Sequence, residues 1–438
     1  MAKINIITLG CSKNLVDSEN TATQINNQNI EFTFDEFNFD ADTVIINTCG
    51  FIADAKEESV NTILEFAQAK IDGKIENLYV MGCLSERYKD ELKEDIPEVD
   101  RFFGVNDIQE IVEQLHIDYK KELLGERVIS TPSHFAYLKI SEGCDRTCAF
   151  CAIPLIRGKH KSVPKEILIS QAKNLAKKGV KELILIAQDL SYYGLDIYKK
   201  QMLPELTEKL SEIEGIEIIR LHYAYPANFP EAILQVMREK QNIAKYLDIP
   251  FQHISDNVLL RMKRRHDKQL TINLINKIRK EVPGIAIRTT LLVGFPGETE
   301  KDFEELKTFV KEMRFDRLGV FTYSEEENTY GGDNYEDNVP ETVKQARADE
   351  IMEIQQQISY EINQQKVGKI FQVIIDKENE DYYIGRTEFD SPEVDNEVLI
   401  KKIKELKTGE IYPIKIISAE EFDLYGELVF LKLNLSKG

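Results

Sequence analysis

The sequence predicts an α/β protein in three consecutive parts: an N-terminal parallel α/β sheet, a central open partial (β/α)6 barrel and a small C-terminal β-barrel. Three observations lead to this fold class. Apolar runs alternate with helical segments near the N-terminus, six further strand-helix units follow, and short strands with acidic turns fill the C-terminal end. The chain has 438 residues, and a typical domain of about 150 residues suggests roughly three domains.

The N-terminal part contains three apolar runs, each followed by an amphipathic segment. They occupy residues 4–7, 44–46 and 78–81. A cysteine follows each run within a few residues, namely Cys11, Cys49 and Cys83. Because the carboxyl ends of parallel strands gather at one edge of a sheet, where ligands bind, we expect the three thiols to converge there. This domain is assigned to residues 1–125.

The central part repeats a strand followed by a helix six times. The strand-like runs are residues 137–140, 183–187, 216–221, 246–250, 285–293 and 318–322. Six such units predict an open partial barrel, smaller than the common barrel of eight units. Residues 341–365 contain good helix formers and few breakers, so they predict a long closing helix that Gly368 ends. The central domain is therefore assigned to residues 134–365.

Short strands with acidic turns between them make up the C-terminal part. The runs are residues 371–375, 382–385, 398–400, 412–416 and 428–430. A small β-barrel is the simplest architecture for strands of this length, and it is assigned to residues 366–438. This domain carries 11 Lys+Arg against 15 Asp+Glu residues, a net charge of −4.

The composition and the first residues bear on compartment and partners. Residues 1–10 are typical of a β-strand rather than an export signal, and no stretch of about 18 apolar residues occurs, so we expect a cytoplasmic protein with no membrane partner. Six cysteines in a reducing compartment favour metal ligation or redox chemistry over disulfides. The net charge of −20 argues against free nucleic acid as a partner and favours a basic protein.

The densest group of cysteines is Cys144, Cys148 and Cys151, in the spacing CxxxCxxC just after the first barrel strand. Such a loop can wrap three thiolates around one face of an iron-sulfur cubane and leave one iron without a protein ligand. A structural zinc site is the alternative, but zinc takes four ligands, and His160 is the only close histidine. The spacing favours the iron-sulfur cluster.

With the aromatic Phe150 before its last cysteine, this motif resembles the signature of the radical S-adenosylmethionine (SAM) superfamily. The resemblance implies that the three cysteines hold a 4Fe-4S cluster whose open iron is chelated by SAM. Reductive cleavage of SAM then yields a 5'-deoxyadenosyl radical, which removes a hydrogen atom from an unreactive C–H bond. It also implies a radical-SAM barrel in the central domain and a low-potential electron donor, such as flavodoxin or ferredoxin, as a partner.

The three-part order, with Cys11, Cys49 and Cys83 at its start, is similar to that of the methylthiotransferase family over essentially the whole chain. This resemblance implies that the N-terminal triad holds a second 4Fe-4S cluster, whose free iron accepts or carries the sulfur to be inserted, and that the C-terminal barrel is TRAM-like. One SAM molecule methylates that sulfur and another supplies the radical. Taken singly, each cysteine is better explained as a buried, inert thiol, whereas the matching strand-end placement favours ligation.

Two further segments lie where β/α barrels place ligand groups. Gln188 ends the second barrel strand, and Gly294 with Phe295 ends the fifth. In the resembling enzymes such segments line the SAM pocket. The residues expected to bind SAM are therefore Phe150, Gln188, Gly294 and Phe295. At the fifth strand, an ordinary strand-turn-helix junction explains the residues equally well.

Other charged or titratable residues receive no functional role. His222 and His253 follow strands, where lone histidines are more often satisfied structural residues than ligands. A basic run follows the cysteine loop and is interpreted as a solvated face. It consists of Arg157, Lys159, His160 and Lys161.

The methylthiotransferase family has two main branches, one acting on isopentenylated adenosine in transfer RNA and one on an aspartate of small-subunit ribosomal protein twelve. The segments CSKNLVDSEN, KISEGCDRTCAFCAIP and QDLSYYG resemble the ribosomal-protein branch, and Asp189 stands where the transfer-RNA branch more usually has Asn. A domain that grips transfer RNA should be basic, whereas this C-terminal domain is acidic. One departure is Asn328 in place of the Gly common in that branch; Asn tolerates the same left-handed backbone.

We therefore expect a methylthiotransferase that inserts a methylthio group at the β-carbon of an aspartate in that basic ribosomal protein. Methylthiolation of isopentenyladenosine in transfer RNA is the alternative, and a non-catalytic iron-sulfur carrier is an alternative of another class. One acidic loop of the C-terminal barrel is expected to help dock the substrate, although a solvated turn would explain it too. Its residues are Asp390, Glu393, Asp395 and Glu397.

Overall fold

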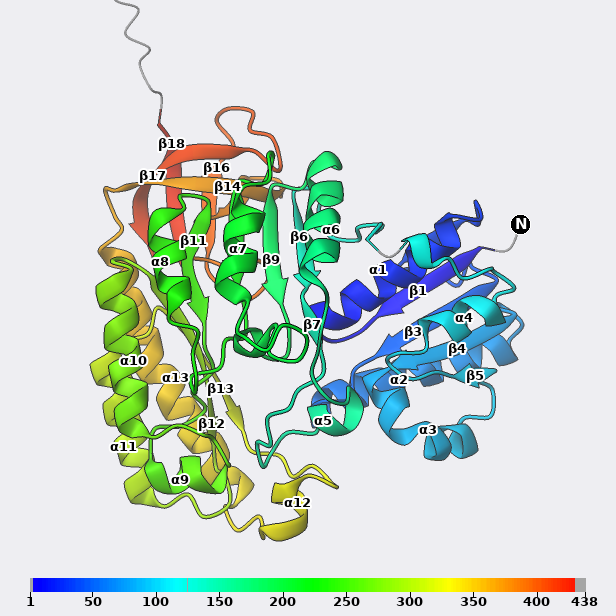
Figure 1. Cartoon of the computed structure of the whole chain (residues 1–438), viewed down its shortest axis with the longest axis horizontal. Helices are drawn as coiled ribbons and strands as arrows, with labels where there is room; N and C mark the ends of the chain where they lie inside the picture. The colour runs from blue at the N-terminus through cyan, green and yellow to red at the C-terminus, as the bar shows by residue number, and fades with distance from the viewer. Residues whose placement is uncertain (1–2, 124, 430–438) are drawn as a thin grey trace, which may run out of the picture. The chain divides into compact units, whose positions relative to one another are not determined.

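A computed structural model describes residues 3–123 and 125–429 of the chain (Figure 1). The chain divides into two compact units. The first comprises Met1–Thr131, Ala136–Gly215 and Ser324–Tyr335, and the second comprises Pro132–Phe135, Ile216–Tyr323 and Glu336–Gly438. All six cysteines therefore belong to the first unit.

The first unit begins with a five-stranded sheet in the order β2-β1-β3-β4-β5, in which every neighbouring pair is parallel. Its strands are β1 (Ile4–Thr8), β2 (Phe32–Phe34), β3 (Thr43–Thr48), β4 (Asn77–Gly82) and β5 (Arg101–Phe102). The three strands expected in this part are confirmed. The edge strands β2 and β5 were not predicted, because two or three residues are too few to show a periodicity.

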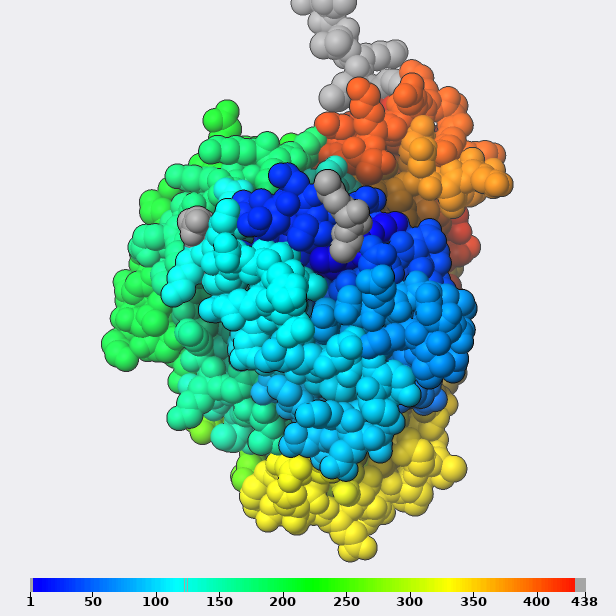
Figure 2. Space-filling view, turned by 90° about the vertical axis from the view of Figure 1, so that its right-hand side faces the viewer, coloured from blue at the N-terminus to red at the C-terminus, as the bar shows by residue number. Residues whose placement is uncertain are grey.

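Helices cover both faces of this sheet. They are α1 (Ser12–Asn26), α2 (Ala53–Ile71), α3 (Cys83–Asp95) and α4 (Ile108–Gln114). Successive strand residues point to opposite faces. Ile6 therefore packs with Ile25 of α1 in one apolar cluster, while Ile7 packs with Phe66 of α2 in another. Figure 2 shows the surface of this N-terminal part in blue and cyan.

The elements around the second cysteine motif follow in the chain. They are η1 (Lys121–Leu123), β6 (Phe135–Lys139), β7 (Ser141–Glu142), α5 (Ile153–Ile156), β8 (Lys161–Ser162), α6 (Lys165–Lys177), β9 (Glu182–Ile186), η2 (Leu190–Tyr192), α7 (Leu203–Ser211) and, later, α12 (Tyr330–Asn334). Strands β7 and β8 pair antiparallel, with Glu142 opposite Lys161. This pairing closes the loop that carries the three cysteines.

The second unit contains four parallel strands with helices between them. They are β10 (Ile218–Leu221), α8 (Ala232–Glu239), β11 (Ile243–Asp248), α9 (Asp256–Arg261), α10 (Lys268–Glu281), β12 (Ala286–Val293), α11 (Glu300–Met313) and β13 (Arg317–Thr322). The central sheet has six strands in the order β13-β12-β11-β10-β9-β6. The six predicted barrel strands are thereby confirmed.

The long closing helix is present as α13 (Glu341–Gln364), and Gly368 follows it with a φ of +85°. One turn of α13 faces the core through Ile351, which is fully buried. Over residues 3–123 and 125–429, no helix is long and apolar enough to cross a membrane.

The C-terminal strands close into a barrel in the order β14-β15-β16-β18-β17. They are β14 (Ile370–Glu378), β15 (Tyr382–Arg386), β16 (Glu397–Lys401), β17 (Ile411–Ala419) and β18 (Asp423–Leu428). The last strand, expected at 428–430, begins earlier than predicted: β18 starts at Asp423 and includes Leu428, whereas Phe430 lies outside the described residues. The strand alternates charged Asp423 with buried Leu424, so its apolar content was too low to be recognised.

The acidic loop of the barrel is only partly exposed, which corrects its interpretation as a docking surface or a solvated turn. Asp390 is fully buried and pairs with Arg317. The side chain of Asp395 is buried too, accepting from Tyr246 Oη at 2.8 Å and lying 3.3 Å from Nε of Arg288. Two of the four acids therefore balance arginines within the second unit, the buried Arg317 and the half-buried Arg288. Sequence could not reveal this, because both arginines lie on distant strands.

Candidate functional site

Three thiols of the first unit follow three neighbouring strands of its five-stranded sheet. Cys11 directly precedes α1, Cys49 follows β3, and Cys83 is the first residue of α3. Burial, and to a smaller extent the charges of Cys11 and Cys49, raise the pKa of Cys83 to about 11. The three thiols follow the carboxyl ends of neighbouring parallel strands and so lie along one edge of the sheet, as expected.

Glycine lets two of these loops approach closely. Gly10 has a φ of +88°, and a Cβ atom there would lie 2.6 Å from Cβ and 2.8 Å from Sγ of Cys49. A Cβ atom on Gly50 would lie 2.8 Å from the backbone nitrogen of Leu84, the residue after Cys83. Real Cβ atoms do not approach this closely. Side chains at either position would push the cysteine loops apart.

The surroundings of these thiols fit a bound group that is not protein. The hydroxyl oxygens of Ser12 and Ser85 are buried and have no hydrogen-bond partner within the described part of the chain. Burial raises the pKa of the Cys49 and Cys83 thiols, and a metal that binds them as thiolates would displace their protons. Among the described residues, no group of three His, Cys, Asp or Glu side chains is placed to hold a single metal ion. Three thiols are the donor type that iron-sulfur clusters take, and in a cubane each thiolate binds a different iron.

The second motif lies in the loop between β7 and β8. Gly143 has a φ of +73° and lies against the carbonyl oxygen of Lys159, which leaves no space for a Cβ atom. The backbone N–H of Cys144 donates to the carbonyl oxygen of Gly158 at 3.0 Å, so the two ends of the loop are held together. Burial raises the pKa of Cys144 to about 12, although the backbone N–H of Arg146 donates to its Sγ at 3.4 Å.

Arg146, inside the motif, ties the loop to the end of β9. Its Nε donates to Oδ2 of Asp189 at 2.8 Å, and both side chains are buried. Asp189 also accepts from the backbone N–H of Ser191 at 2.8 Å and caps η2. The guanidinium lies 5.5 Å from the centre of the Tyr192 ring. Asp189, singled out as a branch marker, is therefore a structural anchor of the cysteine loop.

Two of the residues expected to bind SAM belong to the first unit. Gln188 follows β9, and its Nε2 donates to Oε1 of Glu142 at 2.6 Å. Its own Oε1 is buried and has no partner among the residues the structure describes, which suits a ligand donor. Phe150 is half-buried between Cys148 and Cys151. The structure thus brings Gln188 next to Glu142, which directly precedes the cysteine loop.

The other two residues expected to bind SAM belong to the second unit. Gly294 has a φ of +73°, and the backbone N–H groups of Gly294 and Phe295 both donate to Oε2 of Glu298. The ring of Phe295 is fully buried, 5.0 Å from that of Tyr323. Glu298 therefore fixes the turn, and Phe295 packs in the core. A role for either residue toward SAM stays a prediction.

The two unassigned histidines are buried in the second unit. Nδ1 of His253 accepts from the backbone N–H of Ser255 at 3.0 Å, and Nε2 of His222 lies 2.9 Å from Oγ of Ser391. Both contacts are internal to the protein. They are consistent with the structural role that lone histidines usually have.

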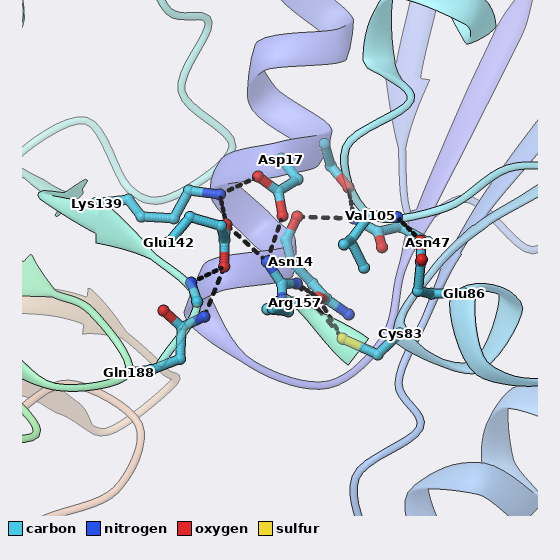
Figure 3. Close-up of polar contacts among 12 residues, drawn as sticks. Asn14, Asp17, Asn47, Cys83, Glu86, Val105, Lys139, Glu142, Arg157 and Gln188 are labelled. Carbon is cyan, nitrogen blue, oxygen red and sulfur yellow. Dashed lines mark hydrogen bonds and ion pairs between the residues drawn. The ribbon is translucent and has the colours of Figure 1, made fainter. Parts of the chain in front are cut away.

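Arg157 is buried rather than solvated, which corrects the interpretation of the basic run. Its side chain is 2% exposed and pairs with Asp17 at 3.1 Å and with Glu142 at 2.9 Å (Figure 3). His160 is buried as well, with its Nε2 3.0 Å from a serine hydroxyl. Only the lysines of the run are exposed, Lys159 and Lys161. Local sequence gave no sign of this, because the partners of Arg157 lie on α1 and β7.

The segment that contains Glu326 and Asn328 contacts two helices of the N-terminal sheet domain, within the first unit. Oε2 of Glu326 accepts from Lys56 at 2.7 Å and from Arg87 at 2.5 Å. Asn328 has a φ of +58°, so the left-handed backbone expected at this position is confirmed. The segment could be found from its sequence, but its partners on α2 and α3 could not.

Three family descriptions match successive parts of the chain. Residues 3–104 match the "Uncharacterized protein family UPF0004", residues 138–310 match the "Radical SAM superfamily", and residues 367–429 match the "TRAM domain". Each match falls inside one of the three domains expected from the sequence.

Curated proteins resemble the chain over nearly its full length. A Bacteroides fragilis protein named "Ribosomal protein uS12 methylthiotransferase RimO" is 58% identical over 427 residues, covering 97% of this chain and 99% of the relative. Proteins of the same name from Christiangramia forsetii and Flavobacterium johnsoniae are each 57% identical, covering 97% of this chain and 94% and 98% of the relatives.

Solved structures resemble the chain in fold. The radical SAM methyltransferase TsrM from Kitasatospora setae, with cobalamin and a [4Fe-4S] cluster bound, gives a TM-score of 0.55 at 13% identity and covers 76% of this chain and 77% of that chain. The cobalamin-dependent SAM radical enzyme OxsB, with aqua-cobalamin bound, gives 0.51 at 12% identity and covers 76% of this chain and 55% of that chain. At such identity the likeness concerns the fold alone.

Proposed function

Since the chain belongs to the RimO family of radical SAM methylthiotransferases, we propose that it inserts a methylthio group at the β-carbon of an aspartate in ribosomal protein uS12. The chain is a transferase, and the reaction replaces one hydrogen of a C–H bond by SCH3. The observation that carries the proposal is that relatives named for this activity are 57% and 58% identical over 97% of the chain.

The cysteines divide into two ligand sets in this proposal. One 4Fe-4S cluster is assigned to Cys144, Cys148 and Cys151, and a second to Cys11, Cys49 and Cys83. The chemistry supplied by the first cluster with SAM is removal of a hydrogen atom from an unreactive C–H bond. We also propose the domain boundaries 1–125, 134–365 and 366–438, which the three family matches support.

Other residues of the chain position the cofactor. Gln188 would accept a hydrogen bond from SAM through its unpartnered Oε1, beside the half-buried Phe150. Gly294 and Phe295 would present the turn that Glu298 holds, with glycine allowing close backbone approach. The ion pair between Arg146 and Asp189, buried in the first unit, would keep the cysteine loop in one conformation.

The substrate and the other partners follow from charge and cofactor chemistry. A net charge of −20 suits a lysine- and arginine-rich ribosomal protein, because opposite charge speeds encounter and fixes register. The electron donor in this proposal is a low-potential protein such as flavodoxin or ferredoxin. The site of action is the cytosol, where small ribosomal subunits are made.

Anaerobic reconstitution tests the proposal. The protein should bind about eight irons when each triad carries a 4Fe-4S unit. With SAM, dithionite and purified uS12, we expect 5'-deoxyadenosine and a uS12 mass increase of one methylthio group in place of one hydrogen. Transfer RNA carrying isopentenyladenosine should stay unmodified under the same conditions. Modified transfer RNA with unmodified uS12 would assign the protein to the other branch.

A further inference from the structure

A network of largely buried charged side chains connects Cys83 of the N-terminal triad with Glu142, which lies two residues before Cys144 of the second motif (Figure 3). Arg157 is at its centre. Its Nη1 donates to Asp17 at 3.1 Å and to Glu142 at 2.9 Å. Its Nη2 donates to Oδ1 of Asn14 at 2.5 Å and to Sγ of Cys83 at 3.4 Å. The guanidinium therefore contacts a member of the N-terminal triad directly.

Arg157 also leads to the second motif. Glu142, which accepts from Arg157 through Oε2, accepts from Nε2 of Gln188 through Oε1 at 2.6 Å. Glu142 is followed at once by Gly143 and Cys144. A continuous chain of contacts thus runs from Cys83 through Arg157 and Glu142 to the start of the second cysteine loop.

The charges of this network balance. Lys139 is the second cation, with its Nζ in contact with Asp17 and 2.7 Å from Oε2 of Glu142. Two cations therefore face two carboxylates, and all four side chains are at most 18% exposed. Removing the charge of Arg157 would leave one net negative charge beside Cys83, whereas removing that of Asp17 would leave one net positive charge.

A purely structural role explains the burial but not the contact with sulfur. Buried ion pairs add little stability over apolar side chains of the same size, so they are weak candidates for holding a fold together. Cys83 is already packed against Ala152 and Ile156. Asn14 already joins the ends of β1 and β3, because its Nδ2 donates to the carbonyl oxygens of Leu9 and Thr48 at 2.9 and 3.0 Å.

We propose that Arg157 is a positioning residue that sets the reduction potential of the cluster held by Cys11, Cys49 and Cys83. This inference rests on the proposed function, because it needs that cluster. Net charge and hydrogen bonds to the ligand sulfurs are what tune iron-sulfur potentials. The N–H donor and the positive charge at Cys83 stabilise the more negative, reduced state, so Arg157 raises the potential.

The test uses the full chain with Cys144, Cys148 and Cys151 replaced by Ala, so that only the N-terminal cluster is present. In this parent, potentials are measured by dithionite titration with electron paramagnetic resonance. We expect Arg157→Gln to lower the reduced-to-oxidised ratio at a fixed potential at least tenfold, which is a shift of about 59 mV for one electron. Arg157→Lys, which keeps the charge, should lie closer to the parent.

Two further variants make the result decisive. Asp17→Asn leaves Arg157 in place and should shift the potential in the opposite direction; it also serves if Arg157→Gln does not fold. Arg127→Gln is the matched control, because Arg127 forms a buried pair with Glu19 of α1 at 3.0 Å and should not affect the potential.

The outcomes separate this inference from the proposed function. A parent that binds no iron would overturn both the second cluster and the role of Arg157. A parent with about four irons, whose potential is the same in Arg157→Gln and in Asp17→Asn, would overturn the role of Arg157 alone.

Discussion

Asp390 lies fully buried against Arg317, and its Oδ1 accepts a hydrogen bond from Nη2 of that arginine. The same carboxylate accepts from the hydroxyl of Thr387 at 2.5 Å. Both acceptor oxygens are thus engaged inside the second unit. Asp390 is therefore an internal counter-charge for Arg317, and no basic partner can reach its carboxylate without displacing that arginine.

Asp390→Asn should therefore act on stability. A buried ion pair that loses one partner leaves an uncompensated charge, which typically costs about 3–5 kcal/mol. We expect a lower melting temperature in calorimetry, with little dependence on salt. Glu393→Gln is the matched control, because Glu393 lies in the same loop and is exposed. It should change the free energy of unfolding by less than about 0.5 kcal/mol. Equal melting temperatures for Asp390→Asn and the unmodified protein would contradict the buried pair.

His253 makes the protein sensitive to acid. Burial lowers its pKa to about 3, below the value of about 6.5 in an unfolded chain. The unfolded state therefore binds a proton first as the pH falls. The stability contributed by the neutral ring is complete above about pH 6.5 and is lost toward about pH 3, by up to about 1.4 kcal/mol per pH unit.

His253→Asn should flatten this decline, because its Oδ1 can accept the hydrogen bond from Ser255 and it does not titrate. Calorimetry between pH 7.5 and pH 4.5 compares the two proteins. Burial also lowers the pKa of His266 to about 3, so part of the decline of stability with falling pH should remain in the variant. Parallel curves for the variant and the unmodified protein would show that His253 is not the source.

Asn328 holds a left-handed backbone, at a φ of +58°. Asn328→Gly should keep the melting temperature and the activity, since glycine adopts this conformation without strain. Asn328→Val should lower stability by about 1–2 kcal/mol, because a branched Cβ clashes there. Thermal unfolding of both variants checks this. Equal behaviour of the glycine and valine variants would mean that the turn rearranges freely.

The two cysteine triads should separate functionally. Cys83→Ala should leave reductive cleavage of SAM largely intact but stop sulfur insertion, because the second cluster delivers sulfur in the proposed scheme. The triple variant of Cys144, Cys148 and Cys151 should make no 5'-deoxyadenosine at all. Both products are measured in the same anaerobic assay by mass spectrometry. Abundant methylthio product from Cys83→Ala would argue that Cys83 is only a packed thiol.

Most elements of the fold could be predicted, because their strands carry apolar runs with clear breaks between them. The three N-terminal strands and the convergence of their cysteines followed from the rule that parallel strand ends share an edge. The predicted position of β18 was too far along the chain, because the charged and small residues of this strand hide the alternation around Leu424.

The charged side chains were harder to interpret. Arg157 and Asp390 each lie in a polar segment that a single sequence assigns to the surface, and each is buried by partners far along the chain: Asp17 is 140 residues from Arg157, and Arg317 is 73 from Asp390. Pairing over such separations leaves no local pattern. The network around Arg157 therefore depends on the three-dimensional contact between α1 and the segment that follows the cysteine loop.

Mass spectrometry of ribosomal protein uS12 from a strain lacking this gene tests the central claim most directly. The intact protein from the parent strain should carry one methylthio group on a single aspartate, and the protein from the deletion strain should lack it. Restoring the gene should restore the modification, and a copy with Cys144→Ala should not. Fully methylthiolated uS12 in the deletion strain would contradict the account.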